Sequence, residues 1–206
     1  MSLTVWLSAL GLYVLFRAWY DNWRGPIRAK EIDDLIAAAQ NGPTAGANDM
    51  SIIRKFLQED DGREFVMCNL VKVADGMIPH PTTGVPTPGR DLMQVYSKAF
   101  MPALFARGGH PAIVARKVGG YVDAWHVEPD PGWTVMGYMR YRSRRDLMEL
   151  AADKRFHHVH PFKIAGTAET FSFPTQPMLM MFVGPRLWVG LVIALGAALT
   201  QIALLA

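Results

Sequence analysis

The final twenty residues of the chain, Leu187–Ala206, contain no charged side chain. A helix of that length extends about 30 Å, which is the thickness of the hydrocarbon core of a bilayer. Its only polar residues are Thr200 and Gln201 near the far end, so the run lacks the polar face that a surface helix of a soluble domain carries. We therefore predict a membrane-spanning helix, with its flanking residues, at 182–206.

A second apolar stretch lies near the start of the chain. It covers the 14 residues Leu3–Phe16 and is followed by Arg17 and by tyrosine and tryptophan residues, which suit the headgroup level of a membrane. Fourteen residues are also compatible with a signal peptide or with a buried core helix. Because no basic residue precedes the stretch and no small-residue cleavage pattern follows it, we expect an uncleaved membrane helix and interface at residues 1–23.

The basic residues beside the two apolar segments predict an orientation. Arg17, Arg24, Arg28 and Lys30 follow the first segment, and Arg186 precedes the second. Segments rich in lysine and arginine stay on the cytoplasmic side of the inner membrane. We therefore expect the central part of the chain on the cytoplasmic side and both termini outside.

The composition restricts the partners of the central part. The net charge is only +3, and much of the positive charge lies beside the apolar segments. This pattern favours the lipid bilayer as a partner and argues against nucleic acid. Cys68 is the single cysteine, so no disulfide can form within the chain, which agrees with a reducing compartment.

The residues between the two membrane segments divide into a connector and one domain. Residues 24–61 contain two amphipathic stretches, at 29–41 and 50–60, and we expect a helical connector that packs on the domain. Residues 62–176 suffice for one domain with its own core. The loop at 74–90 holds four prolines and three glycines, and we expect no regular structure in it.

The hydrophobic periodicity of this domain predicts an α+β fold. The expected order is strand, helix, strand, strand, helix, strand, which is the split βαβ or ferredoxin-like arrangement. The corresponding ranges are 65–73, 91–107, 112–118 with a possible extension to 127, 133–142, 143–156 and 163–173. Ser143 and Asp146 have the spacing of a capping box at the start of the second helix.

Four segments resemble the dimeric α/β-barrel superfamily, specifically a bacterial branch without an assigned activity. They are VMCNLVKV at 66–73, ARGG at 106–109, YMRYRSRRDLMEL at 138–150 and ADKRFHHVHPFKIAG at 152–166. The resemblance implies self-association, in which two four-stranded sheets close around a shared cavity. Relatives include cofactor-free monooxygenases, lactone isomerases and haem enzymes, but none of their catalytic residue sets can be placed on this sequence.

A cavity of that kind would need polar residues that face its interior. Tyr138 and Arg140 are two positions apart and therefore share one face of their expected strand, and Asn69 lies in the middle of another strand. Together with His126 they form our candidate ligand-binding set, able to hold a carboxylate, an enolate or a carbonyl group. The alternative is a polar cluster with a purely structural role.

Two further residue sets have weaker motifs. His157 and His160 would share a face at the end of a helix, a spacing compatible with two metal or haem ligands, although histidines at a helix C-terminus also have a structural explanation. We expect no cofactor. Gly190, Ala194 and Ala198 recur every four residues, which permits close packing of membrane helices.

These observations favour a membrane-anchored accessory or structural subunit of a larger membrane complex. The alternative is a small-molecule enzyme or ligand binder, with oxygenase-like or isomerase-like chemistry in the barrel cavity on a hydrophobic substrate. The sequence does not decide whether the chain is an enzyme. The absence of a nucleotide-binding, hydrolase or metalloprotease motif weighs against one.

Overall fold

The computed structural model of the chain describes residues 2–42, 46–179 and 183–205. The fold divides into two compact units. One unit is Arg24–Gln176, and the other combines the residues up to Trp23 with those from Pro177 onward. The expected connector and the expected α+β domain therefore pack as one unit, and the two apolar ends of the chain form the other.

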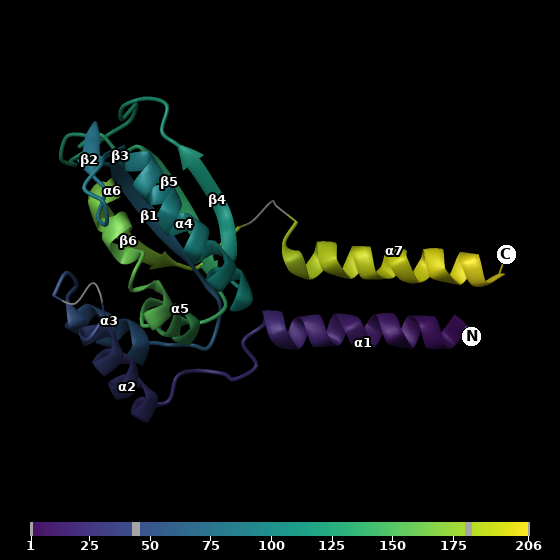
Figure 1. The fold of residues 1–206 in the computed structure, drawn as a ribbon. Coiled ribbons are helices and arrows are strands. Elements are labelled where there is room, and N and C mark those ends of the chain that lie inside the picture. The colour runs from purple at the N-terminus through teal and green to yellow at the C-terminus, as the bar shows by residue number, and fades with distance from the viewer. Residues whose placement is uncertain (1, 43–45, 180–182, 206) are drawn as a thin grey trace. The chain divides into compact units, whose positions relative to one another are not determined.

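A four-stranded antiparallel sheet forms the centre of the Arg24–Gln176 unit (Figure 1). Its strands are β1 (Phe65–Val73), β4 (His110–Arg116), β5 (Val135–Tyr141) and β6 (Thr167–Thr175). They lie in the order β4-β5-β1-β6, so β1 pairs with β5 on one side and with β6 on the other. The predicted bounds of β1 are confirmed to the residue.

Helices cover one face of this sheet, and the main hydrophobic core lies beneath them. They are α4 (Gly89–Ala106), α5 (Arg144–Ala151), the short 3₁₀ helix η1 (Lys154–Phe156) and α6 (His160–Gly166). Burying a large apolar side chain stabilises a fold by about 1.5–3 kcal/mol. The buried members of this core are Phe65, Leu92, Leu104, Tyr141, Leu150, Phe156, Val159 and Phe162.

The prediction that residues 74–90 have no regular structure was wrong on both sides of the centre of this segment. Residues Met77–Pro79 (β2) and Pro86–Pro88 (β3) pair as a small antiparallel hairpin. Its turn is closed by His80, whose Nδ1 accepts hydrogen bonds from the backbone N–H groups of Thr82 and Thr83, 3.3 and 3.2 Å away. Proline is compatible with a two-stranded sheet, since each strand has an unpaired edge where no N–H is required.

The predicted last strand at 163–173 was wrong in its first half. Residues His160–Gly166 form α6, and β6 begins only at Thr167. Pro161 at the start of α6 explains the difference, because its fixed backbone angle favours the first turn of a helix. The predicted helix at 143–156 is likewise divided into α5 and η1.

The sequence predicted a capping box, which has two hydrogen bonds, at the N-terminus of α5. One of these two bonds forms. Ser143 is buried, and its hydroxyl oxygen accepts the backbone N–H of Asp146 at 3.1 Å. The Asp146 carboxylate accepts the Ser143 hydroxyl at 2.6 Å and the Arg142 guanidinium at 2.5 Å. It therefore binds side chains, where a full capping box would use the backbone N–H of Ser143.

The two connector helices, α2 (Ala29–Gln40) and α3 (Met50–Gln58), pack on the domain through α5. Arg145 of α5 is buried, and its guanidinium donates to the Glu31 carboxylate at 3.0 Å and to the Pro26 carbonyl at 3.1 Å. A small core accompanies this ion pair, formed by Ile32, Ile36, Leu57 and Met148. The connector is thus held by apolar burial and by one buried cation.

The terminal unit consists of two apolar helices, α1 (Ser2–Tyr20) and α7 (Pro185–Leu205). Each is long and apolar enough to cross a membrane, over Leu3–Tyr20 and Pro185–Leu205 respectively. Only 6% of either window is buried inside the described part of the chain, so neither helix forms part of its hydrophobic core. Residue 182, the expected start of the C-terminal anchor, lies outside the described residues.

We expect Arg145→Ala to lower the free energy of unfolding of the Arg24–Gln176 unit by about 2 kcal/mol, because it removes the buried guanidinium that hydrogen-bonds Glu31 and Pro26, and hydrogen bonds from a charged group are worth about 1.5–3 kcal/mol. The matched control is Arg90→Ala, at an arginine whose side chain is 83% exposed, with an expected loss below about 0.5 kcal/mol. Urea unfolding of the full chain in detergent, followed by circular dichroism, measures both. Equal losses would contradict the role given to Arg145.

The same ion pair predicts a pH dependence. A hydrogen bond from Arg145 lowers the pKa of Glu31 below its usual range. A carboxylate with a lowered native pKa adds stability above its unfolded pKa of about 4.3, and that stability is lost as the pH falls through the native pKa. We expect Glu31→Gln to be less stable than the wild type at pH 7 and nearly equal to it once the pH is below the native pKa of Glu31. A constant difference across this range would contradict the pairing.

Candidate functional site

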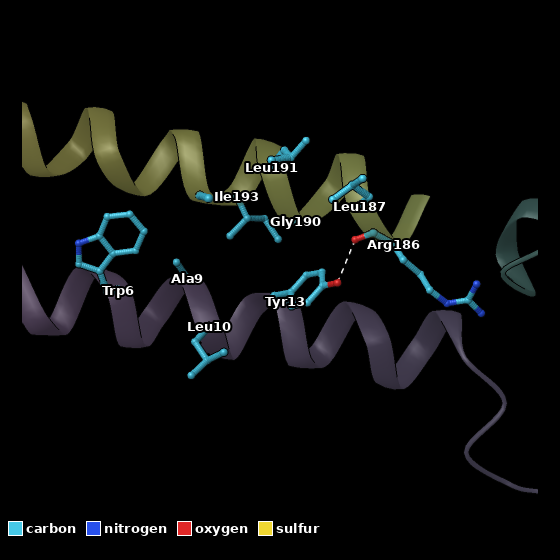
Figure 2. A pocket seen from close by; sticks show the side chains of 10 residues that line it. Trp6, Ala9, Leu10, Tyr13, Arg186, Leu187, Gly190, Leu191 and Ile193 are labelled. Atoms are coloured by element: carbon cyan, nitrogen blue, oxygen red, sulfur yellow. Dashed lines mark hydrogen bonds between the residues drawn. The ribbon is translucent and has the colours of Figure 1, made fainter. Parts of the chain in front are cut away.

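Helices α1 and α7 lie side by side and pack through small residues and one hydrogen bond (Figures 1 and 2). The hydroxyl of Tyr13 donates to the backbone carbonyl of Arg186 at 2.9 Å. Gly190 lies against the Tyr13 ring, where an added Cβ would come within 3.2 Å of Cε2. Ala9 and Ala197 are the buried alanines of this contact. Small side chains let the two helices approach closely, as in membrane helix pairs generally.

An ion-pair network joins the two helices at the end next to the connector. The Asp21 carboxylate accepts Arg17 at 2.5 Å and Arg186 at 2.7 Å. The Arg186 guanidinium also lies over the Tyr20 ring, 5.1 Å from its centroid. One carboxylate therefore holds two cations that stand at the ends of separate apolar segments, where the headgroup region would begin.

An apolar groove of about 490 Å³ lies along the helix pair (Figure 2). Of the three residues predicted to pack membrane helices, Gly190 and Ala194 line it, whereas Ala198 is half-buried elsewhere on α7. The contact they make is with α1 of the same chain. The residues that line the groove are Trp6, Ala9, Leu10, Tyr13, Arg186, Leu187, Gly190, Leu191, Ile193 and Ala194.

We expect Gly190→Leu to separate α1 from α7, because the added side chain would collide with Tyr13. Spin labels at Leu7 and Leu195, in a Cys68→Ala background, would report a longer and broader distance distribution in lipid nanodiscs. Gly196→Leu is the control, since a Cβ at Gly196 meets nothing within 4 Å. If both variants keep the wild-type distances, the contact at Gly190 does not hold the helices together.

The structure does not bring the predicted ligand-binding set together. In an antiparallel sheet, directly paired residues project to the same face. Asn69 pairs with Gly137, whereas Tyr138 pairs with Cys68 and Arg140 with Val66. Asn69 therefore lies on the helix-covered face and the other two on the opposite face. Its Nδ2 donates to the carbonyls of Met67 and Gly137, at 2.9 and 3.1 Å.

Arg140 has a structural set of partners. It is buried, with 4% exposure, and its Nε donates to the Glu64 carboxylate at 2.8 Å. Its Nη1 donates to the carbonyl of Gly108 in the turn before β4. The guanidinium thus ties three segments of the domain, as the structural alternative for this polar cluster requires.

His126, the last member of the set, lies apart from the strands. It is exposed in the loop 117–134, with a φ of 54° that residues other than glycine seldom adopt. The base of this loop is held by an ion pair between Lys117 and Asp130 and by a hydrogen bond from the Trp133 indole to the Tyr121 hydroxyl at 3.1 Å. No contact joins His126 to the other three residues within the described part of the chain.

The face of the sheet opposite the helices is apolar and largely uncovered within the Arg24–Gln176 unit. Phe171 and Phe173 of β6 are 46% and 45% exposed, stack on each other and pair with Leu70 and Cys68 of β1. Ile113 of β4 adds to this surface and is 40% exposed. We call it the open sheet face, and it comprises Leu70, Ile113, Met136, Tyr138, Phe171 and Phe173, together with Cys68, which faces the same side but is buried between its neighbours. Contiguous exposed apolar surface of this kind marks an interaction site.

The two predicted metal ligands lie near each other. The rings of His157 and His160 are 6.5 Å apart between centroids and nearly perpendicular. No group of three or more histidine, cysteine, aspartate or glutamate side chains with metal-binding geometry exists among the described residues. Lys163 interacts electrostatically with His160, and its ammonium group would repel a metal cation bound there.

Sequence reasoning missed two features that the structure brings out. The open sheet face was visible only as the alternation of Phe171 and Phe173, and their strand was predicted with incorrect bounds. The environment of His160 was not visible, because the Tyr96 ring that packs on it, 5.8 Å away between centroids, lies on a different helix. The prediction of a strand at Lys163 also placed this residue away from its helical neighbours in α6.

Comparison with known proteins supports the fold and nothing more specific. No protein-family model and no curated protein sequence matches the chain. The chain is similar to the crystal structure of RPA0582, a protein of unknown function from Rhodopseudomonas palustris, with 16% identity, a TM-score of 0.53 and coverage of 65% of this chain and 96% of that one. For methylated RPA0582 the values are 17%, 0.54, 66% and 96%.

Proposed function

We propose that the protein is an accessory or structural subunit of a membrane complex, anchored by α1 and α7 in the inner membrane. The two apolar helices and the basic residues beside them support this proposal. Arg17, Arg24, Arg28 and Lys30 at and after the end of α1, and Arg186 in the first turn of α7, favour a central domain on the cytoplasmic side, with both termini outside.

The arrangement of the central sheet supports a ferredoxin-like fold of the dimeric α/β-barrel type. The first of its four strands pairs with the third and the fourth, and the second pairs with the third, as a split βαβ fold requires. The open sheet face is then the surface on which a second copy would pack. The observation that carries this proposal is the exposure of Phe171 and Phe173 in the middle of that surface.

Small residues on the outer sides of the helix pair favour contact with further membrane helices. A Cβ at Gly11 or at Gly196 meets nothing within 4 Å. Because small residues let helix backbones approach closely, these positions suit docking of a partner's helices. The enzymatic alternative has less support, since Arg140 is bound by Glu64 and Asn69 lies on the other face of the sheet.

We expect Phe173→Glu to convert a detergent-solubilised dimer into a monomer and to raise the dissociation constant at least about 100-fold, because it buries an unpaired charge in the interface. The control is Ile164→Glu, at a residue of α6 that is 59% exposed and lies off the open sheet face. Native mass spectrometry distinguishes the two variants. A wild type that is monomeric at micromolar concentration would refute self-association.

The accessory role predicts a stoichiometric partner protein. We expect extraction at native expression to give a complex heavier than the homodimer, and Gly196→Leu to lose the partner while the spacing of α1 and α7 is unchanged. Sizing together with intact-complex mass measurement tests this. A lone homodimer from wild-type membranes would contradict the accessory role and leave the self-association intact.

A further inference from the structure

Four polar side chains gather where α4 meets η1 and α6, on the helix-covered side of the domain. His160 lies at the centre of the group, with Tyr96 5.8 Å away and His157 6.5 Å away between ring centroids. The Lys163 Nζ lies 5.4 Å from the centroid of the same Tyr96 ring. Neither the ligand set predicted from the sequence nor the open sheet face includes Tyr96 or Lys163.

Not every polar atom of this group has a hydrogen-bond partner. The His160 Nδ1 lies 2.9 Å from the Phe156 carbonyl, which can only accept, so the neutral ring carries its proton on Nδ1 and its Nε2 is an acceptor. The His157 Nε2 is buried and has no hydrogen-bond partner among the described residues. A buried polar atom without a partner destabilises the fold, so a ligand that supplies one is favoured.

The group contains a basic side chain and no carboxylate. Lys163 forms no ion pair with a carboxylate within the described part of the chain, although 15 ion pairs occur elsewhere in it. Burial lowers the pKa of both Lys163 and His160 and raises the pKa of Tyr96 to about 12. Burial therefore penalises the ammonium form of Lys163, which has no carboxylate beside it, and a bound anion would favour that form.

We propose that Tyr96, His157 and Lys163 bind a small oxyanion, a phosphate or phosphomonoester group, beside the His160 ring. Lys163 supplies the compensating charge, His157 donates to the anion through the nitrogen that now lacks a partner, and Tyr96 provides a hydroxyl donor. Anions gain more than neutral groups from such hydrogen bonds, because charge-assisted bonds are about twice as strong. A metal ion is disfavoured at this place by the ammonium group of Lys163.

Nuclear magnetic resonance of the full chain, labelled with ¹⁵N-histidine and held in phosphatidylcholine nanodiscs, tests this proposal. Titration with inorganic phosphate should move the ring nitrogen signals of His157 and His160 and leave those of His126 in place. Nanodiscs that contain phosphatidic acid, measured without added phosphate, distinguish a lipid headgroup from a free anion as the source of the group. A response to either supports the site.

We expect Lys163→Gln to weaken phosphate binding about tenfold or more, and Lys163→Arg to restore it, since loss of one charged hydrogen bond is worth about 1.5–3 kcal/mol. The control is Lys30→Gln, at an exposed lysine of α2. The proposal is overturned if neither phosphate nor phosphatidic acid moves the two histidine signals, if only Zn²⁺ moves them, or if Lys163→Gln binds as tightly as Lys30→Gln. None of these outcomes depends on dimer formation.

Discussion

The pairing of β1 on both sides is the constraint on which the central domain depends. Because β5 and β6 hydrogen-bond to its two edges, the alternation of side chains along β1 divides the whole sheet into two faces. One face carries Phe65 and Met67 into the core beneath the helices, and the other carries Cys68 and Leu70 onto the open sheet face. A shift of one residue in this register would exchange the two sets.

The elements of the fold that were predicted correctly are those with a clear hydrophobic pattern in the sequence. Seven of the nine residues of β1 are apolar and three of them are valine, and the bounds of the strand were predicted correctly. The segment 160–166 is too short and too apolar for periodicity to separate a strand from a helix, so α6 was missed. The helices of the connector and the two apolar terminal helices have strong periodic or continuous patterns, and they were found.

The candidate site was harder to predict, because strand register and long-range pairing decide it. The sequence allowed both Asn69 and Arg140 to point into a cavity. Whether they lie on the same face of the sheet depends on which residue is paired with each of them. Glu64 and Gly108, which bind Arg140, come from segments that carry no motif. Tyr96 and Lys163 are 67 positions apart in sequence, and only the packing of α4 on α6 brings them together.

The terminal helices and the open sheet face lead to one account, in which membrane anchors hold a domain that is completed by a second copy. The most direct test is to place a photo-crosslinking phenylalanine analogue at Phe171 and irradiate native membranes. The account predicts a crosslinked species of about twice the 22.9 kDa chain mass, with no such species for the analogue at Ile164. Crosslinking at Phe171 only to other proteins, or to none, would contradict it.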